Sequence, residues 1–449
     1  MKKNVNMLSG SIVKGILALS LPIMVMNVLG SLFNIIDLSI LKIFDNGNGY
    51  VVGAVGVCGP LITLATNLVV GISTGSNVIV ARYLGKNSPE KVERAIGVSL
   101  LFALVGGMTL LIVGLTCARR FLILANCSEV LLDDASLYFR LYFLGVPLLM
   151  LYNFCAVILR ASGDSRRPMI YSILSGITKV VLSYIFVGAF GMKIVGVALA
   201  TIVSWVVSFS LIFICLFRSK TSVKIKLNRI KLYLPEFKEI LHIGIPTALQ
   251  LGFYSIANVV ISSAANTFGP AASTGVSIAN TFDGILYNIC HAPSLAIMPY
   301  ISQNLGAKNP KRAFDSVKKC ILLTICIGGI LGAVSSLLSP QLSSLMSDDP
   351  EVIRFSQQKM IIISSTYFIC GINDVLCAAM RSMGRPITAT ICGLIFLCIL
   401  RFLWVYFVFP LVKSLTFLYL VWPIGWALSI CTIIFFYIHR AKQLKNDTI

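Results

Sequence analysis

The sequence carries little charge and lacks any polar stretch long enough to form a soluble domain. Only 12% of its 449 residues are Asp, Glu, Lys or Arg, and 57% are hydrophobic, whereas soluble domains are roughly half apolar and about one quarter charged. A composition this poor in charge excludes an ordinary soluble protein. We expect the chain to lie within a lipid bilayer.

The sequence also lacks the motifs of most catalytic and metal sites. Its 13 Cys include no C-x-x-C pair and its three His are scattered, so it indicates neither a zinc site nor a disulfide framework. It contains no G-x-x-x-x-G-K-[ST] loop, so ATP is not expected to drive it directly. The apolar runs hold no His, Asp or Glu cluster with catalytic spacing. We therefore expect no metal, no cofactor and no enzymatic activity.

Long apolar runs recur along the whole chain. A helix needs about 20 residues to cross a hydrocarbon core of about 30 Å. The predicted spans are residues 15–41, 51–80, 95–117, 136–159, 168–190, 194–217, 240–266, 272–303, 320–340, 358–380, 386–410 and 415–438. The first run follows Met1–Lys14 without a small-residue cleavage site, so we expect a retained span rather than a signal peptide. The predicted fold is an all-α integral membrane protein with twelve transmembrane helices.

The net charge of +20 is distributed by side of the membrane. If the N-terminus is cytoplasmic, most Lys and Arg fall in cytoplasmic connections, including seven between Arg218 and Lys238. We place the remaining bases in the opposite connections at Lys42, Arg119, Arg120, Lys193, Arg354, Lys359 and Lys413. This is the positive-inside pattern, so the basic excess does not indicate nucleic acid. Both termini are predicted to be cytoplasmic, and the short loops suit a bacterial inner membrane.

The chain repeats itself at a constant spacing. Leu84–Pro89 is echoed by Leu305–Pro310, and Leu159–Gly163 is echoed by Met380–Gly384 at an identical offset in the numbering. A third echo, between the prolines of the first and seventh spans, has nearly the same offset. Three such echoes in order are not expected by chance. They predict two repeats of six helices each.

The two predicted halves are residues 1–217 and 239–449, joined by a basic cytoplasmic linker at 218–238. Six spans are an even number, so both halves enter from the same side, as in transporters with parallel repeats that rock about a central cavity. Pro22 and Pro246 are expected to bend their helices and to serve as hinges.

At these echoes the sequence resembles the multidrug and toxic compound extrusion (MATE) family of ion-coupled antiporters. The motifs that carry the resemblance are Pro22, Asn27 and Asn34–Asp37; Ala81–Gly85; Leu159–Pro168; Ile243–Pro246; Gln303–Ala307; and Arg381–Pro386. The resemblance covers nearly the whole chain and implies two six-helix lobes that form a V. Ser255 stands where the NorM-like branch has an acid, so the sequence looks closer to the DinF-like and MepA-like bacterial branch.

Three acidic residues fall inside the predicted spans, and Asp37 is the strongest functional candidate among them. Ionisable groups at the bilayer centre cost about 3 kcal/mol or more and usually line ion or substrate paths. Asn27, Gly30, Asn34 and Asp37 share one face of a helix, so this face is expected to point inward. Asp37 would take up a proton when the cavity faces the acidic side. The alternative is a structural hydrogen bond between helices.

The resemblance implies partners for Asp37. In sodium- or proton-linked members this Asp acts with an Asn on helix 4, an Asn and an Asp on helix 5, and a Thr on helix 6. Asn153 and Thr201 match, whereas Lys179 and Ser183 occupy the helix-5 positions. If Lys179 points into the cavity, it could pair with Asp37 and block sodium. The alternative is that Lys179 snorkels to an interface, and the coupling ion is left open between H⁺ and Na⁺.

The second half offers candidate substrate contacts. Asn280, Asp283 and Tyr287 share one face of the eighth span, and Asn373 and Asp374 lie in the tenth. Carboxylates with aromatic rings suit lipophilic cations. We therefore predict these five residues, with Asn34, to contact substrate. Helix-packing polar sites are the alternative interpretation.

Together these features predict an antiporter that exports small, cationic organic compounds by alternating access. The alternative is a related flippase or exporter of a lipid-linked or other specific metabolite, which would need a groove lined by several Arg. Only Arg140 and Arg401 are clear interior candidates. The expected partners are small organic substrates and the lipid bilayer, with no nucleic acid, and the protein is expected to be a monomer.

Overall fold

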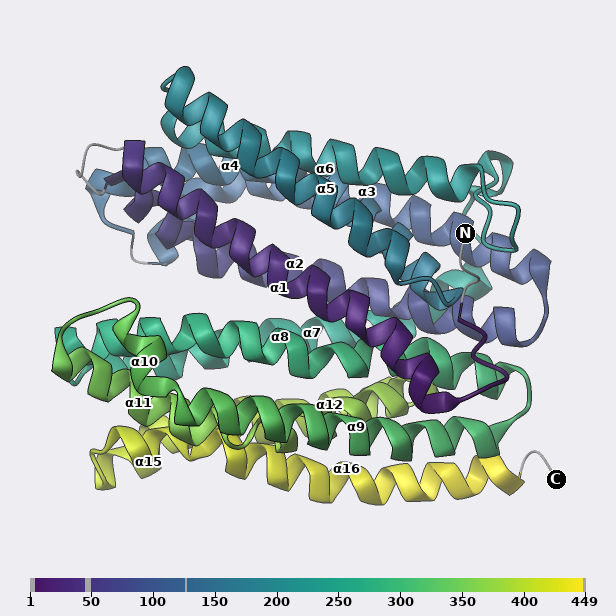
Figure 1. Cartoon of the computed structure of the whole chain (residues 1–449). Coiled ribbons are helices and arrows are strands. Elements are labelled where there is room, and N and C mark those ends of the chain that lie inside the picture. The colour runs from purple at the N-terminus through teal and green to yellow at the C-terminus, as the bar shows by residue number, and fades with distance from the viewer. Residues whose placement is uncertain (1–4, 45–49, 126, 447–449) are drawn as a thin grey trace. The chain divides into compact units, whose positions relative to one another are not determined.

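The computed structural model describes residues 5–44, 50–125 and 127–446, without the side chain of Tyr50, and this part of the chain is helical with no strand (Figure 1). The first half contains α1 (Ile12–Phe44), α2 (Tyr50–Gly85), α3 (Pro89–Leu124), α4 (Glu129–Ala161), α5 (Arg166–Tyr184), the π-helical η1 (Ile185–Ala189), α6 (Lys193–Phe217) and the short η2 (Leu227–Arg229). The second half contains α7 (Leu234–Asn266), α8 (Pro270–Gly306), α9 (Pro310–Leu337), α10 (Ser339–Ser344), α11 (Pro350–Ser364), α12 (Tyr367–Ser382), α13 (Pro386–Gly393), η3 (Leu394–Ile399), α14 (Leu400–Leu403), η4 (Trp404–Val408), η5 (Phe409–Leu411), α15 (Leu415–Tyr419) and α16 (Val421–Asn446).

The helices are long and apolar enough for a multi-pass membrane protein. Within the described ranges, ten helical segments meet the length and composition needed to cross a membrane, and the bent pair α11–α12 makes an eleventh. Helix α8 completes the predicted twelve: it has 37 residues, well above the roughly 20 needed, but it is more polar. Each predicted span lies largely in helical structure, so the all-α membrane fold with twelve helices is confirmed.

The tenth predicted span is a bent pair of helices. Helices α11 and α12 meet at Ser365 and Thr366 at an angle of 46°. The hydroxyl groups of both residues donate to the carbonyl oxygen of Ile362, at 3.3 and 2.9 Å, and such back-bonding bends helices. Helix α9 approaches the same place so closely that a Cβ on Gly332 would overlap the Ser364 carbonyl oxygen. The hydropathy of the sequence does not predict this bend.

The backbone of the connecting turns repeats with the sequence. Asn87 and Lys308 hold equivalent positions in the first pair of echoes, and both adopt a left-handed conformation, with φ of 51° and 56°. Gly163 and Gly384 hold equivalent positions in the second pair and have φ of 87° and 78°. Their N–H groups donate to the carbonyl groups of Arg160 and Arg381. The echoed motifs therefore form the same turns in both halves.

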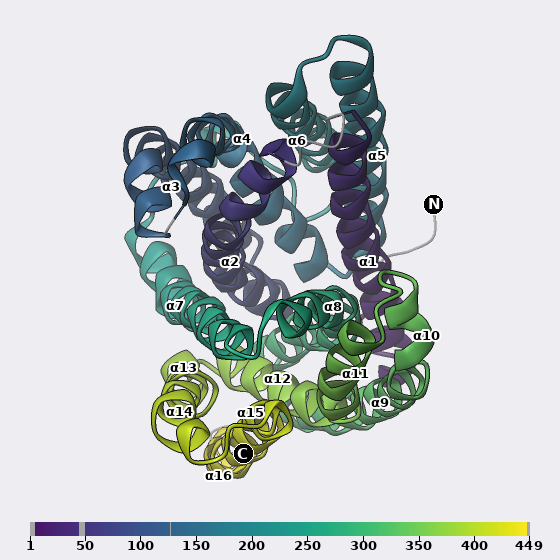
Figure 2. The ribbon, with the colours of Figure 1, turned by 90° about the vertical axis from the view of Figure 1, so that its left-hand side faces the viewer.

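The described helices gather into two compact units, each with its own core. The first unit is formed by residues 25–244 and the second by residues 5–24 with 245–449. In the first unit α4 packs against α2, α3 and α6, and α5 packs against α6. In the second unit α8 packs against α9, α11 and α12, and α12 packs against α16. Figure 2 shows the helices of both units end on.

Two helices belong partly to each unit. Helix α1 contributes residues up to Met24 to the second unit and continues in the first, and α7 passes from the first unit to the second after Gly244. Pro22 and Pro246 lie next to these crossings. The predicted linker, residues 218–238, falls in the first unit, where Lys226 and Arg229 are paired with Glu93 of α3. The predicted boundaries at 217 and 239 stay a prediction.

The segment before α1 is held in the second unit by Arg312 of α9. Its guanidinium donates to the carbonyl oxygens of Met7, Ser9 and Gly10 at 3.0, 2.8 and 3.0 Å, and to the hydroxyl of Tyr300 at 2.7 Å. These contacts anchor the start of α1 on the turn between α8 and α9.

Replacing Arg312 by Ala is expected to release this segment. Hydrogen bonds to a charged group contribute about 1.5–3 kcal/mol each, so we expect the free energy of unfolding to fall by at least about 2 kcal/mol. Cleavage of the first residues by protease should also become faster. Thermal unfolding and limited proteolysis in detergent measure both effects, with the exposed neighbour Lys311→Ala as control. Equal behaviour of the two variants would contradict the anchor.

Candidate functional site

The first unit buries an ion pair between α1 and α5. The Lys179 ammonium lies 2.5 Å from Oδ2 of Asp37 and donates to Oδ1 of Asn34 at 3.1 Å. Ser183, one turn further along α5, donates to Oδ1 of Asp37 at 3.0 Å. Asp37 is only 4% exposed. The structure therefore brings together Asn34, Asp37, Lys179 and Ser183, and the predicted pairing of Lys179 with Asp37 is present.

Helical spacing and one glycine position these groups. Asn34 and Asp37 lie three residues apart on α1, and Lys179 and Ser183 lie four apart on α5, so each pair shares one helix face. One turn before Lys179, Gly176 faces the ring of Phe33, and a Cβ at Gly176 would overlap that ring. The missing side chain lets α1 and α5 approach closely enough for the ion pair.

Two predicted coupling residues do not join this group. Asn153 donates from Nδ2 to the carbonyl of Leu149 at 2.9 Å, and Thr201 donates to the carbonyl of Val197 at 2.9 Å. Both bonds lie within their own helices, and neither side chain is hydrogen-bonded to Asp37 in the described part of the chain. A role for them in coupling stays a prediction that this geometry does not support.

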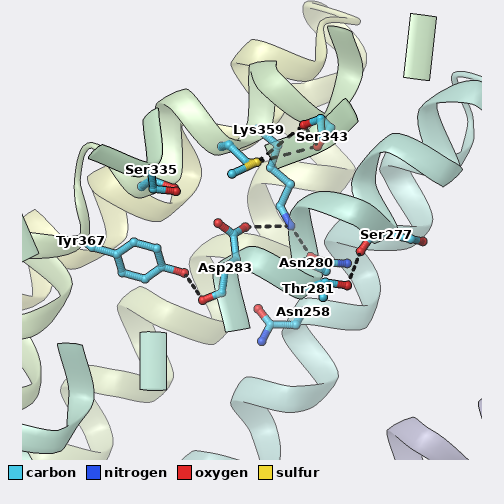
Figure 3. A network of polar contacts seen from close by, with 12 residues as sticks. Asn258, Ser277, Asn280, Thr281, Asp283, Ser335, Ser343, Lys359 and Tyr367 are labelled. Carbon is cyan, nitrogen blue, oxygen red and sulfur yellow. Dashed lines mark hydrogen bonds and ion pairs between the residues drawn. The ribbon is translucent and has the colours of Figure 1, made fainter. Parts of the chain in front are cut away.

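The second unit contains a chemically similar group in the interior (Figure 3). Lys359 of α11 lies 3.1 Å from Oδ2 of Asp283 and donates to Oδ1 of Asn280, both on α8. Tyr367 of α12 donates to the backbone carbonyl of Asp283 at 3.2 Å. Lys359 is 3% exposed and Asp283 is 8% exposed. An Asn and an Asp three residues apart thus bind a lysine side chain in each unit.

A second polar group in this unit contains the other predicted acid. Oδ2 of Asp374 lies 2.7 Å from Nδ1 of His291, and the His291 ring stacks on Tyr287 with ring centroids 5.2 Å apart. Asn373, next to Asp374, accepts a hydrogen bond from Ser429 at 2.7 Å. The predicted substrate residues of the second half therefore separate into two networks, around Asp283 and around Asp374.

Sequence reasoning missed two of these partners. It placed Lys359 in a connection outside the membrane, which is wrong, because the side chain is buried in α11 against Asp283. It treated His291 as an isolated histidine, whereas the ring pairs with Asp374. Lys359 lies at the start of its own predicted span, and His291 lies one turn after Tyr287, and these positions were the available signals.

The described residues offer no obvious metal centre. No three His, Cys, Asp or Glu side chains gather in the described ranges in a way that could hold a metal ion. In these ranges the three acids of the predicted spans, Asp37, Asp283 and Asp374, each contact a basic side chain. The chemistry available is therefore proton uptake and ion-pair exchange inside two helical units. Fold and site together define a multi-pass membrane protein with paired charges in its interior.

Comparison with known proteins gives the family. The family model described as MatE matches residues 22–185 and 246–407, one match in each half. The chain belongs to this family, and the predicted resemblance is confirmed. Its members related to this chain are transporters and not enzymes.

Individual relatives are distant but similar over most of their length. The chain is 24% identical over 348 residues to the "Probable multidrug resistance protein YoeA" of Bacillus subtilis, covering 76% of this chain and 75% of that protein. It is 25% identical over 405 residues to the FAD transporter of Shewanella oneidensis, covering 88% and 87%. A crystal structure of a MATE in complex with MaL6 has a TM-score of 0.91 at 22% identity, covering 99% of this chain and 100% of that one, and shows the same fold.

Proposed function

We propose that this protein exports small organic compounds in exchange for protons, with Asp37 as the proton-binding group. The observation that carries the proposal is the buried contact of 2.5 Å between Asp37 and Lys179. Ionisable groups inside a membrane are costly, are usually paired and commonly line ion or substrate paths. Membership of the MatE family supports the transport step.

Proton binding at Asp37 would break a balanced pair. While the Asp37 carboxylate is charged, Lys179 and Ser183 of α5 stabilise it. The Lys179 ammonium also donates a hydrogen bond to Asn34. Tyr138 of α4 is another titratable group near the carboxylate. A proton on Asp37 removes its negative charge, so Lys179 loses its counter-ion. The α1–α5 contact then changes with proton occupancy, which is the kind of two-state element that can bias alternating access.

The two helices that belong partly to each unit could transmit this change through the fold. Helix α1, which carries Asp37, has residues in both units and changes from one to the other near Pro22, and α7 changes near Pro246. Proline removes a backbone hydrogen bond and allows a helix to bend. We therefore propose that the state of Asp37 acts on the bend at Pro22.

Lys179 favours protons over sodium as the coupling ion. Its ammonium occupies the Asp37 oxygen that a sodium ion would need, and it repels a second cation at that distance. A proton requires no such space, because it binds the carboxylate directly.

Replacing Lys179 by Asn and Ser183 by Asp together is expected to create sodium dependence. The double variant restores the amide and carboxylate that sodium- or proton-linked family members are expected to carry, and it removes the repelling charge. Export driven by a sodium gradient should rise by about tenfold, equivalent to about 1.4 kcal/mol. Transport into sodium-loaded vesicles measures this, with exposed Lys193→Asn as control. Unchanged sodium response would contradict the role given to Lys179.

In the structure, Asp283 and Asp374 indicate less about the charge of the cargo than they do in the sequence. Cationic cargo was predicted from Asp283 and Asp374, yet these carboxylates are paired with Lys359 and His291. A cationic compound would have to displace one of those bases. Relatives of this chain include a probable multidrug resistance protein and a transporter of FAD, which is an anion, so the cargo of this chain need not be cationic.

The test is transport by the purified protein in proteoliposomes under an imposed pH gradient or an imposed sodium gradient. Ethidium is the first cargo, and fluorescein is a second cargo of opposite charge. We expect the pH gradient to drive transport of at least one dye and the sodium gradient to drive neither. Transport that follows sodium alone, or that needs no gradient, would overturn the proposal.

A further inference from the structure

Arg401 in the second unit is buried without a carboxylate partner. It lies in α14, a single helical turn between the π-helical segments η3 and η4, and is 1% exposed. Nη1 donates to Oδ1 of Asn258 at 2.5 Å, and the guanidinium faces the rings of Tyr254 and Trp422 at 4.6 and 4.9 Å. Nη2 is buried and has no hydrogen-bond partner among the described residues. No carboxylate of the described chain is within ion-pair distance of it.

The internal repeat shows what is missing. Asn258 follows Asp37 at the same offset that separates the echoed turns. Arg401 follows Lys179 at an offset one position longer, which also separates residues 185 and 407, the ends of the two family-model matches. Asp37 and Lys179 pair in the first unit, and Asn258 and Arg401 bond in the second. The base is present in both halves, but the acid of the first half is a neutral amide in the second.

The other residues described in the second unit do not supply the missing charge. Asp283 is held by Lys359 and Asp374 by His291. An Arg side chain does not lose its proton in a protein, so Arg401 cannot become neutral. Aromatic faces stabilise a guanidinium but do not neutralise it, and π-helical segments of the kind that flank Arg401 are frequent at functional sites.

We propose that Arg401 binds the carboxylate or phosphate group of an amphipathic organic anion, and that such anions are cargo of this transporter. Guanidinium groups bind both kinds of anion through paired N–H donors. Tyr254 and Trp422 both lie against the guanidinium, and Nη2 is the donor left without a partner among the described residues, so the anion is expected to bind at Nη2. Asn258 and Tyr254, the neighbours of the guanidinium on α7, are themselves only half-buried. The aromatic surroundings favour an organic anion over a hydrated inorganic one.

This inference rests on the proposed export function and extends it to the class of cargo. Its test measures equilibrium binding without any gradient, so failure of proton-driven transport would leave the result unaffected. The probes are fluorescein, which is an anion, and rhodamine 123, a cation built on the same ring system. Fluorescence anisotropy with the purified full-length protein in detergent reports binding of each dye.

Three variants separate charge from structure. Arg401→Gln removes the charge, Arg401→Lys keeps it, and Asn258→Asp supplies an internal counter-ion like that of the first unit. We expect fluorescein binding to weaken by at least about tenfold in Arg401→Gln and Asn258→Asp, since hydrogen bonds to charged groups have effects of this order. Arg401→Lys should retain most of the affinity. Rhodamine 123 should bind no more weakly to any variant.

Because Arg401→Gln could disturb folding, Asn258→Asp is the decisive variant. It should raise the melting temperature by closing a buried ion pair and should still lose fluorescein binding. Equal fluorescein affinity in wild type and Asn258→Asp would overturn the proposal. So would competition by chloride, with gluconate as the inert reference, because chloride at the site would make the ligand an inorganic anion.

Discussion

Replacing Asp37 by Asn is expected to abolish export driven by a pH gradient while leaving the fold intact. The amide keeps the size of the side chain and can still accept hydrogen bonds from Lys179 and Ser183, but it cannot take up a proton. Coupling between two binding sites usually changes affinity by about 5–150-fold, so we expect transport to fall by roughly 100-fold. Initial rates of dye transport in proteoliposomes measure the loss.

The matched control for this variant is Asp133→Asn. Asp133 of α4 carries the same carboxylate in an exposed ion pair with Arg119 at 3.2 Å, and exposed pairs of this kind contribute little. This control should transport at the wild-type rate. If Asp37→Asn kept a pH-driven rate equal to that of the control, Asp37 would have no part in coupling.

Replacing Lys359 by Met is expected to destabilise the second unit strongly. It leaves the carboxylate of Asp283 buried without its ammonium partner, and removing one member of a buried pair costs about 3–5 kcal/mol. Adding Asp283→Asn in the same chain should recover most of that loss, because the orphaned charge disappears. Denaturant or thermal unfolding in detergent measures the difference between single and double variants.

The control for Lys359→Met is Lys318→Met, on the exposed side of α9. That variant should unfold as the wild type does. A double variant as unstable as the single one would show that the loss comes from packing around Lys359 and not from unpaired charge.

Much of the fold follows from two signals in the sequence. Apolar runs of sufficient length locate the spans because the bilayer fixes the length of a crossing helix, and the echoed turns locate the repeat because only certain residues adopt their left-handed backbone. The bend at Ser365 and Thr366 was not predictable, since it depends on hydroxyl groups that bond within the helix and on how closely Gly332 allows α9 to approach.

The candidate site was predictable only in part, for a related reason. Helix periodicity placed Asn34 and Asp37 on one face, but it does not state which residue of another helix meets them, and Lys179 was selected through the family resemblance. A lysine also lowers the hydropathy of its segment and is therefore assigned to a connection between spans. Hydropathy cannot distinguish Lys359, whose charge is balanced by Asp283, from a lysine in water. His291 and Asp374 are far apart in the sequence, and only the packing of α8 on α12 brings them together.

The resemblance transferred unequally between positions. Asn153 and Thr201 match the family pattern by residue type, yet each bonds to a carbonyl of its own helix. Ser183 departs from the pattern and nevertheless contacts Asp37 directly. Lys179, which stands where the resemblance implies an amide, is the side chain that pairs with the Asp37 carboxylate.

Cargo-driven proton movement is the most direct test that Asp37 exchanges protons for cargo. Liposomes containing the protein and a trapped pH-sensitive dye, with no imposed gradient, receive cargo on one side. Wild-type protein is predicted to move protons in the direction opposite to the cargo, and Asp37→Asn is predicted to move none. Cargo that crosses the membrane while the internal pH stays constant in the wild type would contradict proton exchange at Asp37.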